Sequence, residues 1–161
     1  MRHLFANRYR VDSARHESWD YSNPGWYFVT FCTHQRCTCL SEIVEGQVRL
    51  TSIGEIVAEE WTKTPVVRPN LVLGSFVVMP DHLHGLIYLK DGSKALGIAI
   101  NQVKSIASKR IRAEIDPGFR WQTRFHDRIV RDLDELVRID DYIRTNPMAW
   151  ESRTIPIHPI T

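Results

Sequence analysis

Runs of aromatic and β-branched residues along the chain predict buried strands. The strongest cover residues 26–33, 71–79 and 83–89, and weaker ones lie near residues 46–50 and 129–130. Such residues fit the pleated, half-buried surface of a sheet. The segments between them carry breaker residues or helical patterns, so the strands alternate with other elements.

Two segments between the strands predict helices, because apolar residues recur in them every three or four positions. The first is capped by Thr51 or Ser52, and its inner face consists of Ile53, Ile56, Val57 and Trp61. The second covers residues 96–115, and its apolar face consists of Ile100, Val103, Ala107, Ile111 and Ile115. Its opposite, polar face carries Lys104, Ser108 and Arg112.

A third helix is predicted near the C-terminus. Asp132 opens it, and Glu135 three residues later completes a capping box. Its apolar stripe consists of Leu133, Leu136, Val137 and Ile143. Pro147 predicts an end near Asn146, since proline cannot continue a helix.

The predicted order of elements is β-α-β-β-α-β-α. This order is typical of an α+β fold: an antiparallel sheet with helices on one face, a ferredoxin-like βαββαβ core plus a C-terminal helix. A length of 161 residues suits a single catalytic domain over residues 1–161. Within it we expect a basic N-terminal arm over 1–25, a catalytic core over 26–146 and a tail over 147–161.

Composition and charge narrow the function classes only modestly. No apolar run is long enough to span a bilayer, and the N-terminus lacks a signal-peptide core, so we expect a cytoplasmic protein without a membrane partner. The net charge is only +2. Basic residues nevertheless cluster in the arm and near residues 104–112 and 120–131, which favours a nucleic-acid partner. The three cysteines are Cys32, Cys37 and Cys39, and their spacing predicts reduced thiols rather than a metal site.

The clearest local motif is Met79-Pro80-Asp81-His82-Leu83-His84-Gly85. Residues two apart in a strand project to the same side, so His82 and His84 present two imidazoles together, as a divalent metal site needs. Gly85 is expected to leave room for a substrate backbone. Because the pattern is so short, two separate histidines with structural roles remain an alternative. Histidine-triad hydrolases need a third alternate histidine, where this chain has Leu86, and zinc deaminases need motifs that are absent.

The second constellation is Tyr142-Ile143-Arg144-Thr145-Asn146-Pro147. Tyr142 and Asn146 are four residues apart and share a helix face, at an edge expected to border the sheet and stay open to a ligand. A phenol with a pKa of about 10 is a poor nucleophile at neutral pH. A nearby Mg²⁺ or Mn²⁺ can activate a phosphodiester for attack, which joins this constellation to the histidine pair. Taken alone, Tyr142 is also compatible with a half-buried packing role.

These motifs carry a family resemblance over most of the chain. The sequence resembles the REP-associated tyrosine transposases, which are IS200-like, single-tyrosine members of the His-hydrophobic-His (HUH) superfamily. The matching stretches are Asp20-Tyr21-Ser22, Gly25-Trp26-Tyr27-Phe28-Val29-Thr30, Val78 through Gly85, Trp121-Gln122, Phe125 through Arg131, and Tyr142 through Pro147 with Trp150. The motifs occur in the family's order and spacing, which makes them more specific than a lone His-x-His pair.

The resemblance implies a metal-dependent transposase that nicks single-stranded DNA and transfers the strand. His82, His84 and Asn146 would hold Mg²⁺ or Mn²⁺, and Tyr142 would form a 5′-phosphotyrosine intermediate and release a 3′-hydroxyl. The substrates implied are hairpin-forming palindromic repeats (REP elements) with a single-stranded flank. The protein would act as a monomer or a homodimer.

Candidate DNA-binding residues come from the basic clusters and the aromatic arm. They are Arg8, Arg10, Arg15, Trp19, Tyr21, Lys104, Lys109, Arg112, Arg124 and Arg128. For the aromatic residues, packing of the arm on the sheet is an equal alternative. Two other functions remain open: a domesticated hairpin-binding protein that no longer cleaves, and an RNA-binding module on a ferredoxin-like sheet.

Overall fold

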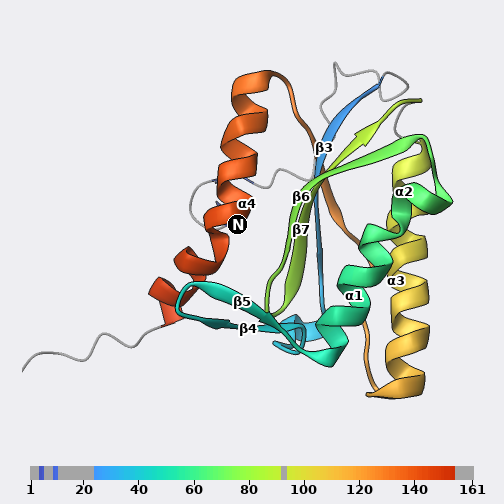
Figure 1. The fold of residues 1–161 in the computed structure, drawn as a ribbon, viewed down its shortest axis with the longest axis vertical. Coiled ribbons are helices and arrows are strands. Elements are labelled where there is room, and N and C mark those ends of the chain that lie inside the picture. Colours follow the sequence, from blue (N-terminus) through green and yellow to red (C-terminus); the bar gives the residue numbers. More distant parts are fainter. Residues whose placement is uncertain (1–3, 6–8, 11–23, 92–93, 155–161) are drawn as a thin grey trace, which may run out of the picture.

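A four-stranded antiparallel sheet forms the centre of the protein (Figure 1). The computed structural model describes residues 4–5, 9–10, 24–91 and 94–154. The four strands are β3 (Gly25–Cys32), β6 (Leu71–Val78), β7 (His82–Leu89) and β8 (His126–Ile129). They stand in the order β6-β7-β3-β8, the ferredoxin-like arrangement, so the predicted α+β fold class is confirmed.

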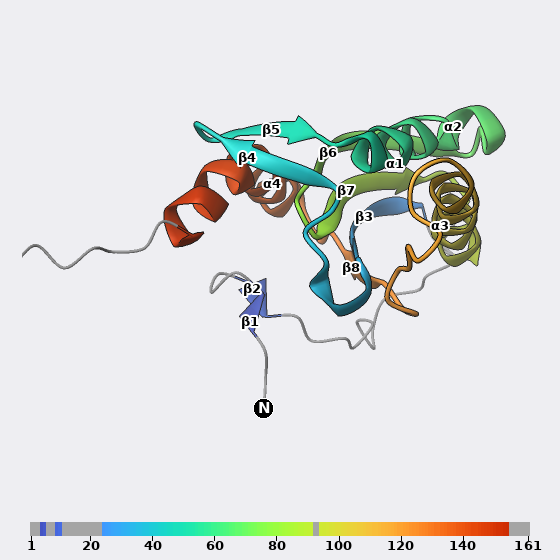
Figure 2. The same cartoon turned by 90° about the horizontal axis from the view of Figure 1, so that it is seen from below.

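Helices cover both faces of this sheet (Figures 1 and 2). α1 (Ser52–Thr62) and α3 (Lys94–Glu114) lie on one face, with the short α2 (Thr64–Val67) beside them. The C-terminal helix α4 (Leu133–Thr154) lies on the opposite face. The helices of the βαββαβ core therefore share one face, as predicted, and the added helix forms a third layer.

Smaller elements surround the sheet. The hairpin of β4 (Ser41–Val44) and β5 (Gln47–Leu50) extends from α1 toward the C-terminal part of α4 (Figure 2). A 3₁₀ turn, η1 (His34–Arg36), follows β3. Within the arm, β1 (Leu4–Phe5) pairs with β2 (Tyr9–Arg10). Among the residues described, no helix is both long and apolar enough to cross a membrane.

Alternation along β3 sends its side chains into two separate cores. Tyr27, Val29 and Phe31 are fully buried in the larger core, under α1 and α3. Trp26 and Phe28 pack in a smaller core with Ile139 and Ile143 of α4. Since partners in an antiparallel pair face the same side, the register fixes which β7 residues meet α4.

Both helices of the larger core largely follow their predicted patterns. Thr51 caps α1 by accepting a hydrogen bond from the Gly54 N–H at 3.1 Å. The predicted inner faces of α1 and α3 are buried except for Ile115, which is 41% exposed. Lys104 and Ser108 were predicted on the face of α3 opposite its apolar one, but both are buried. The segment leading into β8 accounts for this at Lys104, whose Nζ donates to the Gln122 carbonyl at 2.6 Å.

The prediction for α4 is right at its start and wrong at its end. The Asp132 carboxylate accepts from the Glu135 N–H at 2.7 Å, and Glu135 in turn accepts from the Arg131 N–H at 2.7 Å. The helix does not stop near Asn146 but continues through Pro147 to Thr154. Packing of its last turns against the β4–β5 hairpin outweighs the local preference of proline, since tertiary contacts routinely override propensity.

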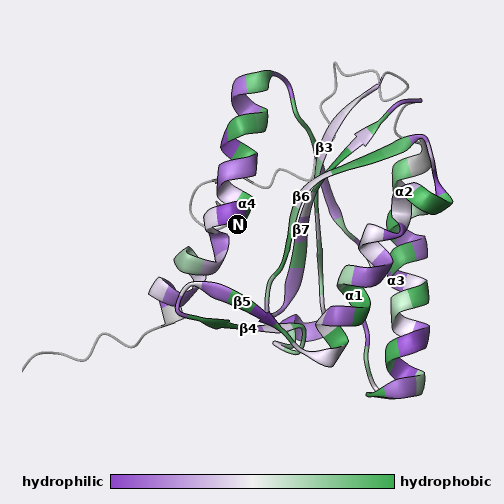
Figure 3. Cartoon of the chain, viewed as in Figure 1, coloured by the Kyte–Doolittle hydropathy of each residue, from purple (hydrophilic) through white to green (hydrophobic). Residues whose placement is uncertain are grey.

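The apolar stripe predicted for α4 is half right. Ile143 is buried and Leu136 packs beside it in the smaller core, but Leu133 and Val137 are 72% and 53% exposed. The helix also buries Ile139, Tyr142 and Asn146. Both α3 and α4 show alternating bands of hydrophobic and hydrophilic residues, as expected for helices with one buried face (Figure 3).

Candidate active site

The imidazoles of His82 and His84 lie side by side on the face of the sheet covered by α4. In the β3–β7 register, His84 is opposite Thr30 and His82 is opposite Cys32. The rings are 3% and 0% exposed, and their Nε2 atoms are 3.0 Å apart. The prediction that spacing of two residues brings the rings together is confirmed.

Each imidazole is held through its other ring nitrogen. The Nδ1–H of His82 donates to Asp81 Oδ1 at 2.5 Å, because a carboxylate can only accept. Nδ1 of His84 lies 2.7 Å from the hydroxyl oxygen of Thr30. These contacts fix both rings and direct both Nε2 atoms to one point, the arrangement found around metal-ligating histidines.

Burial keeps both imidazoles neutral. It lowers the pKa of His82, although the hydrogen bond to Asp81 and its negative charge act in the opposite direction. It lowers the pKa of His84 to well below the usual value, with a further contribution from the neighbouring His82. The neutral form is the one that binds metal ions.

The donor set fits a divalent ion. Two nitrogens that each lie about 2.1 Å from an octahedral ion, at a right angle, are about 3.0 Å apart. The observed Nε2 separation is 3.0 Å. Among the residues that the structure describes, no group of three His, Cys, Asp or Glu side chains suited to a metal occurs. An amide oxygen such as that of Asn146 is a suitable hard donor.

α4 brings Tyr142 and Trp150 to this pair. The Tyr142 ring centroid lies 5.5 Å from that of His84, and the Trp150 ring lies 6.1 Å from that of His82. Asn146 is one helical turn from each of these two residues, on the same face, and is 2% exposed. Residues more than 50 positions apart in the sequence therefore form one cluster.

Two predictions about space at the site are wrong. Tyr142 is only 7% exposed, because its ring packs between His84 and Phe28 rather than at an open edge. Gly85 faces the opposite core, where an added Cβ would lie 2.5 Å from Cζ2 of Trp61. The glycine makes room for Trp61 of α1 and not for a substrate.

Three residues of the site were missed by sequence reasoning. Asp81 adjoins His82 in the motif, and a carboxylate next to a candidate ligand was a usable signal. Thr30 was not identifiable, since only the strand register brings it to His84. Arg36 reaches the site from η1, where its Nε donates to Asp81 Oδ2 at 2.8 Å.

The structure places only some of the predicted DNA-binding residues. Arg8, Arg15, Trp19 and Tyr21 lie outside the described residues, and of Arg10 only the backbone, in β2, is described. Lys104 donates to backbone carbonyls, and Arg128 is ion-paired with Glu135. Lys109, Arg112 and Arg124 are exposed. Arg112 and Lys104 line an open hollow of about 350 Å³ between α3 and residues 120–123.

Comparison with solved structures identifies the fold. The structure of a REP-associated tyrosine transposase bound to a REP hairpin superposes with a TM-score of 0.64, at 21% sequence identity. The match covers 84% of this chain and 73% of that one. This chain has the tyrosine transposase fold.

Two further proteins are similar to this chain. A candidate transposase from Deinococcus radiodurans R1 is 17% identical, with a TM-score of 0.49 over 81% of this chain and 95% of that one. A Haemophilus influenzae protein of unassigned function is 26% identical over 160 residues, which cover 86% of this chain and 89% of that protein. No family model matches the sequence.

Proposed function

We propose that this protein cleaves and rejoins single-stranded DNA at hairpin-forming repeats, with Tyr142 as the nucleophile. The observation that carries the proposal is the cluster of Tyr142 with two convergent imidazoles, at a ring distance of 5.5 Å from His84. The transposase fold supports the same reaction class. A phenol beside a potential metal site is the combination that phosphodiester attack requires.

His82, His84 and Asn146 would hold Mg²⁺ or Mn²⁺. When bound, the ion supplies a Lewis acid that polarises a phosphodiester oxygen. Asp81 and Thr30 hold the two rings, so the ligands are already oriented before substrate arrives. Burial under α4 excludes water, which strengthens electrostatic interactions at the reacting phosphate.

The covalent step exchanges one phosphate ester bond for another, so it needs no separate energy source. The Tyr142 Oη forms a bond to phosphorus and loses its proton, while the bond from phosphorus to the 3′-oxygen breaks and that oxygen takes a proton. The products are a 5′-phosphotyrosine and a free 3′-hydroxyl. Attack by another 3′-hydroxyl reverses the step and restores both the phosphodiester and the phenol.

The proposed DNA partner rests on two observations. The transposase of similar fold was solved bound to a REP hairpin, and exposed cations on α3 and the segment before β8 are available to phosphates here. RNA binding on the sheet is less favourable, because α4 covers the face on which Phe28 lies.

A non-cleaving hairpin-binding protein is the second candidate. It is favoured by the burial of Tyr142 and Asn146, at 7% and 2% exposed, since a substrate has to displace part of α4 to reach them. The two candidates differ in one product: only the enzyme forms a covalent adduct with DNA.

Adduct formation tests the proposal. Labelled hairpin DNA with single-stranded flanks, taken from the neighbourhood of the gene, is mixed with protein with and without Mn²⁺ and resolved on a denaturing gel. We expect a Mn²⁺-dependent adduct that disappears in Tyr142→Phe and persists in Tyr88→Phe, a change on the same sheet face. Hairpin binding without any adduct would support the second candidate.

A further inference from the structure

Arg36 occupies a strained position beside the metal-binding pair. It ends η1, and both it and Gln35 have positive φ angles, of 56° and 51°. This left-handed conformation is uncommon for residues other than glycine and costs free energy. Strained residues of this kind concentrate at functional sites.

Two bonds fix the guanidinium of Arg36 at the rim of the site. Its Nε donates to Asp81 Oδ2 at 2.8 Å, and one Nη donates to Cys32 Sγ at 2.8 Å. Asp81 uses its other oxygen to hold His82, so a single carboxylate orients both the imidazole and the guanidinium. Arginine has five N–H donors, and the side chain of Arg36 is still 44% exposed. Some of these N–H donors therefore face solvent.

The Asp81 carboxylate links Arg36 to the histidine pair. Its Oδ2 accepts a hydrogen bond from Arg36, and its Oδ1 accepts one from His82. Residues 34–38 are exposed, so an extended ligand can cross η1 on its way to the histidines.

We propose that Arg36 binds a backbone phosphate of the single strand, next to the linkage that Tyr142 attacks. The inference rests on the proposed function, in that it takes the ligand to be DNA. A guanidinium matches the geometry of a phosphate, and its donors can bind two phosphate oxygens at once. Because Asp81 already fixes the side chain, little conformational entropy is lost on binding.

Binding of oligo(dT) tests this role without chemistry. A Tyr142→Phe protein binds fluorescent oligo(dT) in the presence of Mn²⁺, and anisotropy gives the affinity over a range of salt concentrations. Each phosphate contact with a single strand contributes a slope of about 0.7 in log K against log salt. We expect Arg36→Gln to weaken binding roughly three- to tenfold at low salt and to reduce the slope by about 0.7. Arg36→Lys should keep most of the slope, since it keeps the charge.

Lys90→Gln is the matched control. It removes the same charge at the other end of β7, eight residues from His82 and therefore roughly 26 Å away. An unchanged affinity and slope in folded Arg36→Gln, or the same loss in Lys90→Gln, would overturn the proposal. A drop in Mn²⁺ affinity alone would also overturn it, because Arg36 would then act only through Asp81.

A side-chain NMR measurement covers the case in which Arg36→Gln does not fold. The guanidinium signals of Arg36 in the Tyr142→Phe protein should shift when oligo(dT) is added, and unshifted signals would refute the contact. Protein that binds oligo(dT) through Arg36 but forms no adduct with hairpins would refute the proposed cleavage alone.

Discussion

His82 and His84 are each supported from the far side of the ring by a different kind of partner. A carboxylate holds His82, while a neutral hydroxyl holds His84. A carboxylate partner fixes the tautomer, because it accepts a hydrogen bond but cannot donate one, and it raises the basicity of the ring. We therefore expect Asp81 to influence the affinity of the proposed metal site.

Asp81→Asn should weaken Mn²⁺ binding by roughly 10–100-fold, the range typical of partners that orient metal-ligating histidines. Isothermal titration calorimetry of the folded variant measures the change. Asp91→Asn is the control, since it removes an exposed carboxylate beyond the other end of β7 and should leave the affinity unchanged. Equal affinity of Asp81→Asn and the wild-type protein would show that Asp81 does not orient a ligand.

The candidate site was partly predictable at this scale. Spacing of two residues in a strand placed His82 and His84 on one side, and spacing of four on a helix placed Tyr142 with Asn146. Neither pattern contains the strand register, which pairs Thr30 with His84, or the path of η1, which brings Arg36 to Asp81. Contacts between distant segments depend on the assembled fold, so these two residues could not be found from the sequence.

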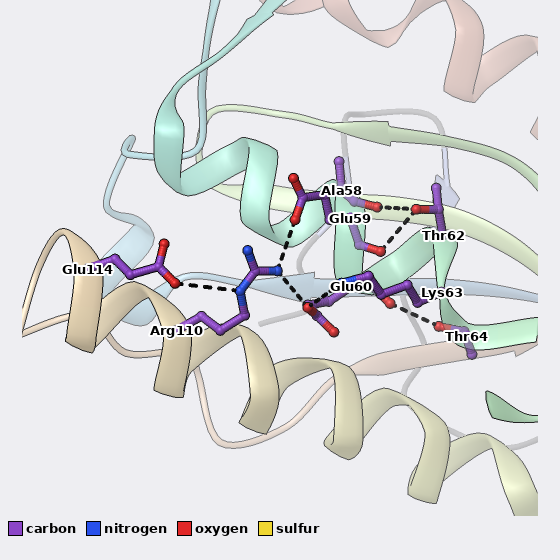
Figure 4. Close-up of polar contacts among 8 residues, drawn as sticks. All are labelled: Ala58, Glu59, Glu60, Thr62, Lys63, Thr64, Arg110 and Glu114. Carbon is purple, nitrogen blue, oxygen red and sulfur yellow. Dashed lines mark hydrogen bonds and ion pairs between the residues drawn. The ribbon is translucent and has the colours of Figure 1, made fainter. Parts of the chain in front are cut away.

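At the scale of elements, an ion-pair network joins α1 to α3 (Figure 4). Arg110 of α3 donates to Glu59 and Glu60 of α1 at 2.9 Å and 2.6 Å, and Lys63 donates to Glu60 at 3.3 Å. Burial raises the pKa of Glu60, but the hydrogen bonds from Arg110 and Lys63 outweigh it, and the net pKa is lowered. Glu60 is 8% exposed, so water screens the ion pair between Arg110 and Glu60 less than the pair between Arg110 and Glu59.

The lowered pKa of Glu60 predicts an acid-sensitive contribution to stability. The folded protein binds fewer protons than the unfolded chain, so the contribution is present above pH 4.5 and disappears as the pH falls through the pKa of the folded state. Glu60→Gln should cost on the order of 1 kcal/mol at neutral pH and much less at acid pH. Urea unfolding across the pH range measures this, with the exposed Glu55→Gln as control. A cost that does not depend on pH would contradict the assignment.

The contact between β7 and α1 gives another prediction. Gly85→Ala would place a Cβ 2.5 Å from Trp61, and overpacking of this kind costs about 1–3 kcal/mol. Gly97→Ala is the control, because nothing lies within 4 Å of its added Cβ and a helix favours alanine over glycine by up to about 1 kcal/mol. Thermal unfolding should separate the two variants. A Gly85→Ala protein with wild-type stability but impaired DNA binding would restore the substrate role first expected for Gly85.

The elements themselves were largely predictable, and α4 shows where prediction fails. Periodicity located the strands, α1 and α3, because each buries a regular apolar face in the larger core. α4 instead buries Tyr142 and Asn146 together with Ile139 and Ile143. A face that combines polar active-site groups with apolar ones has no clear hydrophobic period. The sequence therefore indicated only half of the buried stripe, Leu136 and Ile143, and, at Pro147, the wrong end.

At the scale of the whole molecule, the two faces of the sheet differ. One face carries the larger apolar core, and the other carries the candidate active site. The larger core under α1 and α3 contains most of the buried apolar side chains. The other face joins few apolar residues to the histidines and to α4. Tyr142 and the α4 contacts that bury it therefore lie outside the larger core. Regions that open for ligands are expected to be the less stable parts of a structure.

Metal binding should stabilise the whole fold, because the two ligands of β7 converge only in the folded state. A ligand at about 100 times its Kd stabilises the native state by about 2.7 kcal/mol. For a protein of this size, that corresponds to a rise in Tm of roughly 5–10 °C. We expect Mn²⁺ to raise the Tm of the wild-type protein and EDTA to reverse the rise, as measured by circular dichroism. His82→Ala and His84→Ala should each lose the shift relative to their own metal-free Tm, while the exposed His126→Ala should keep it. A shift that survives in His82→Ala would place the metal site elsewhere in the chain.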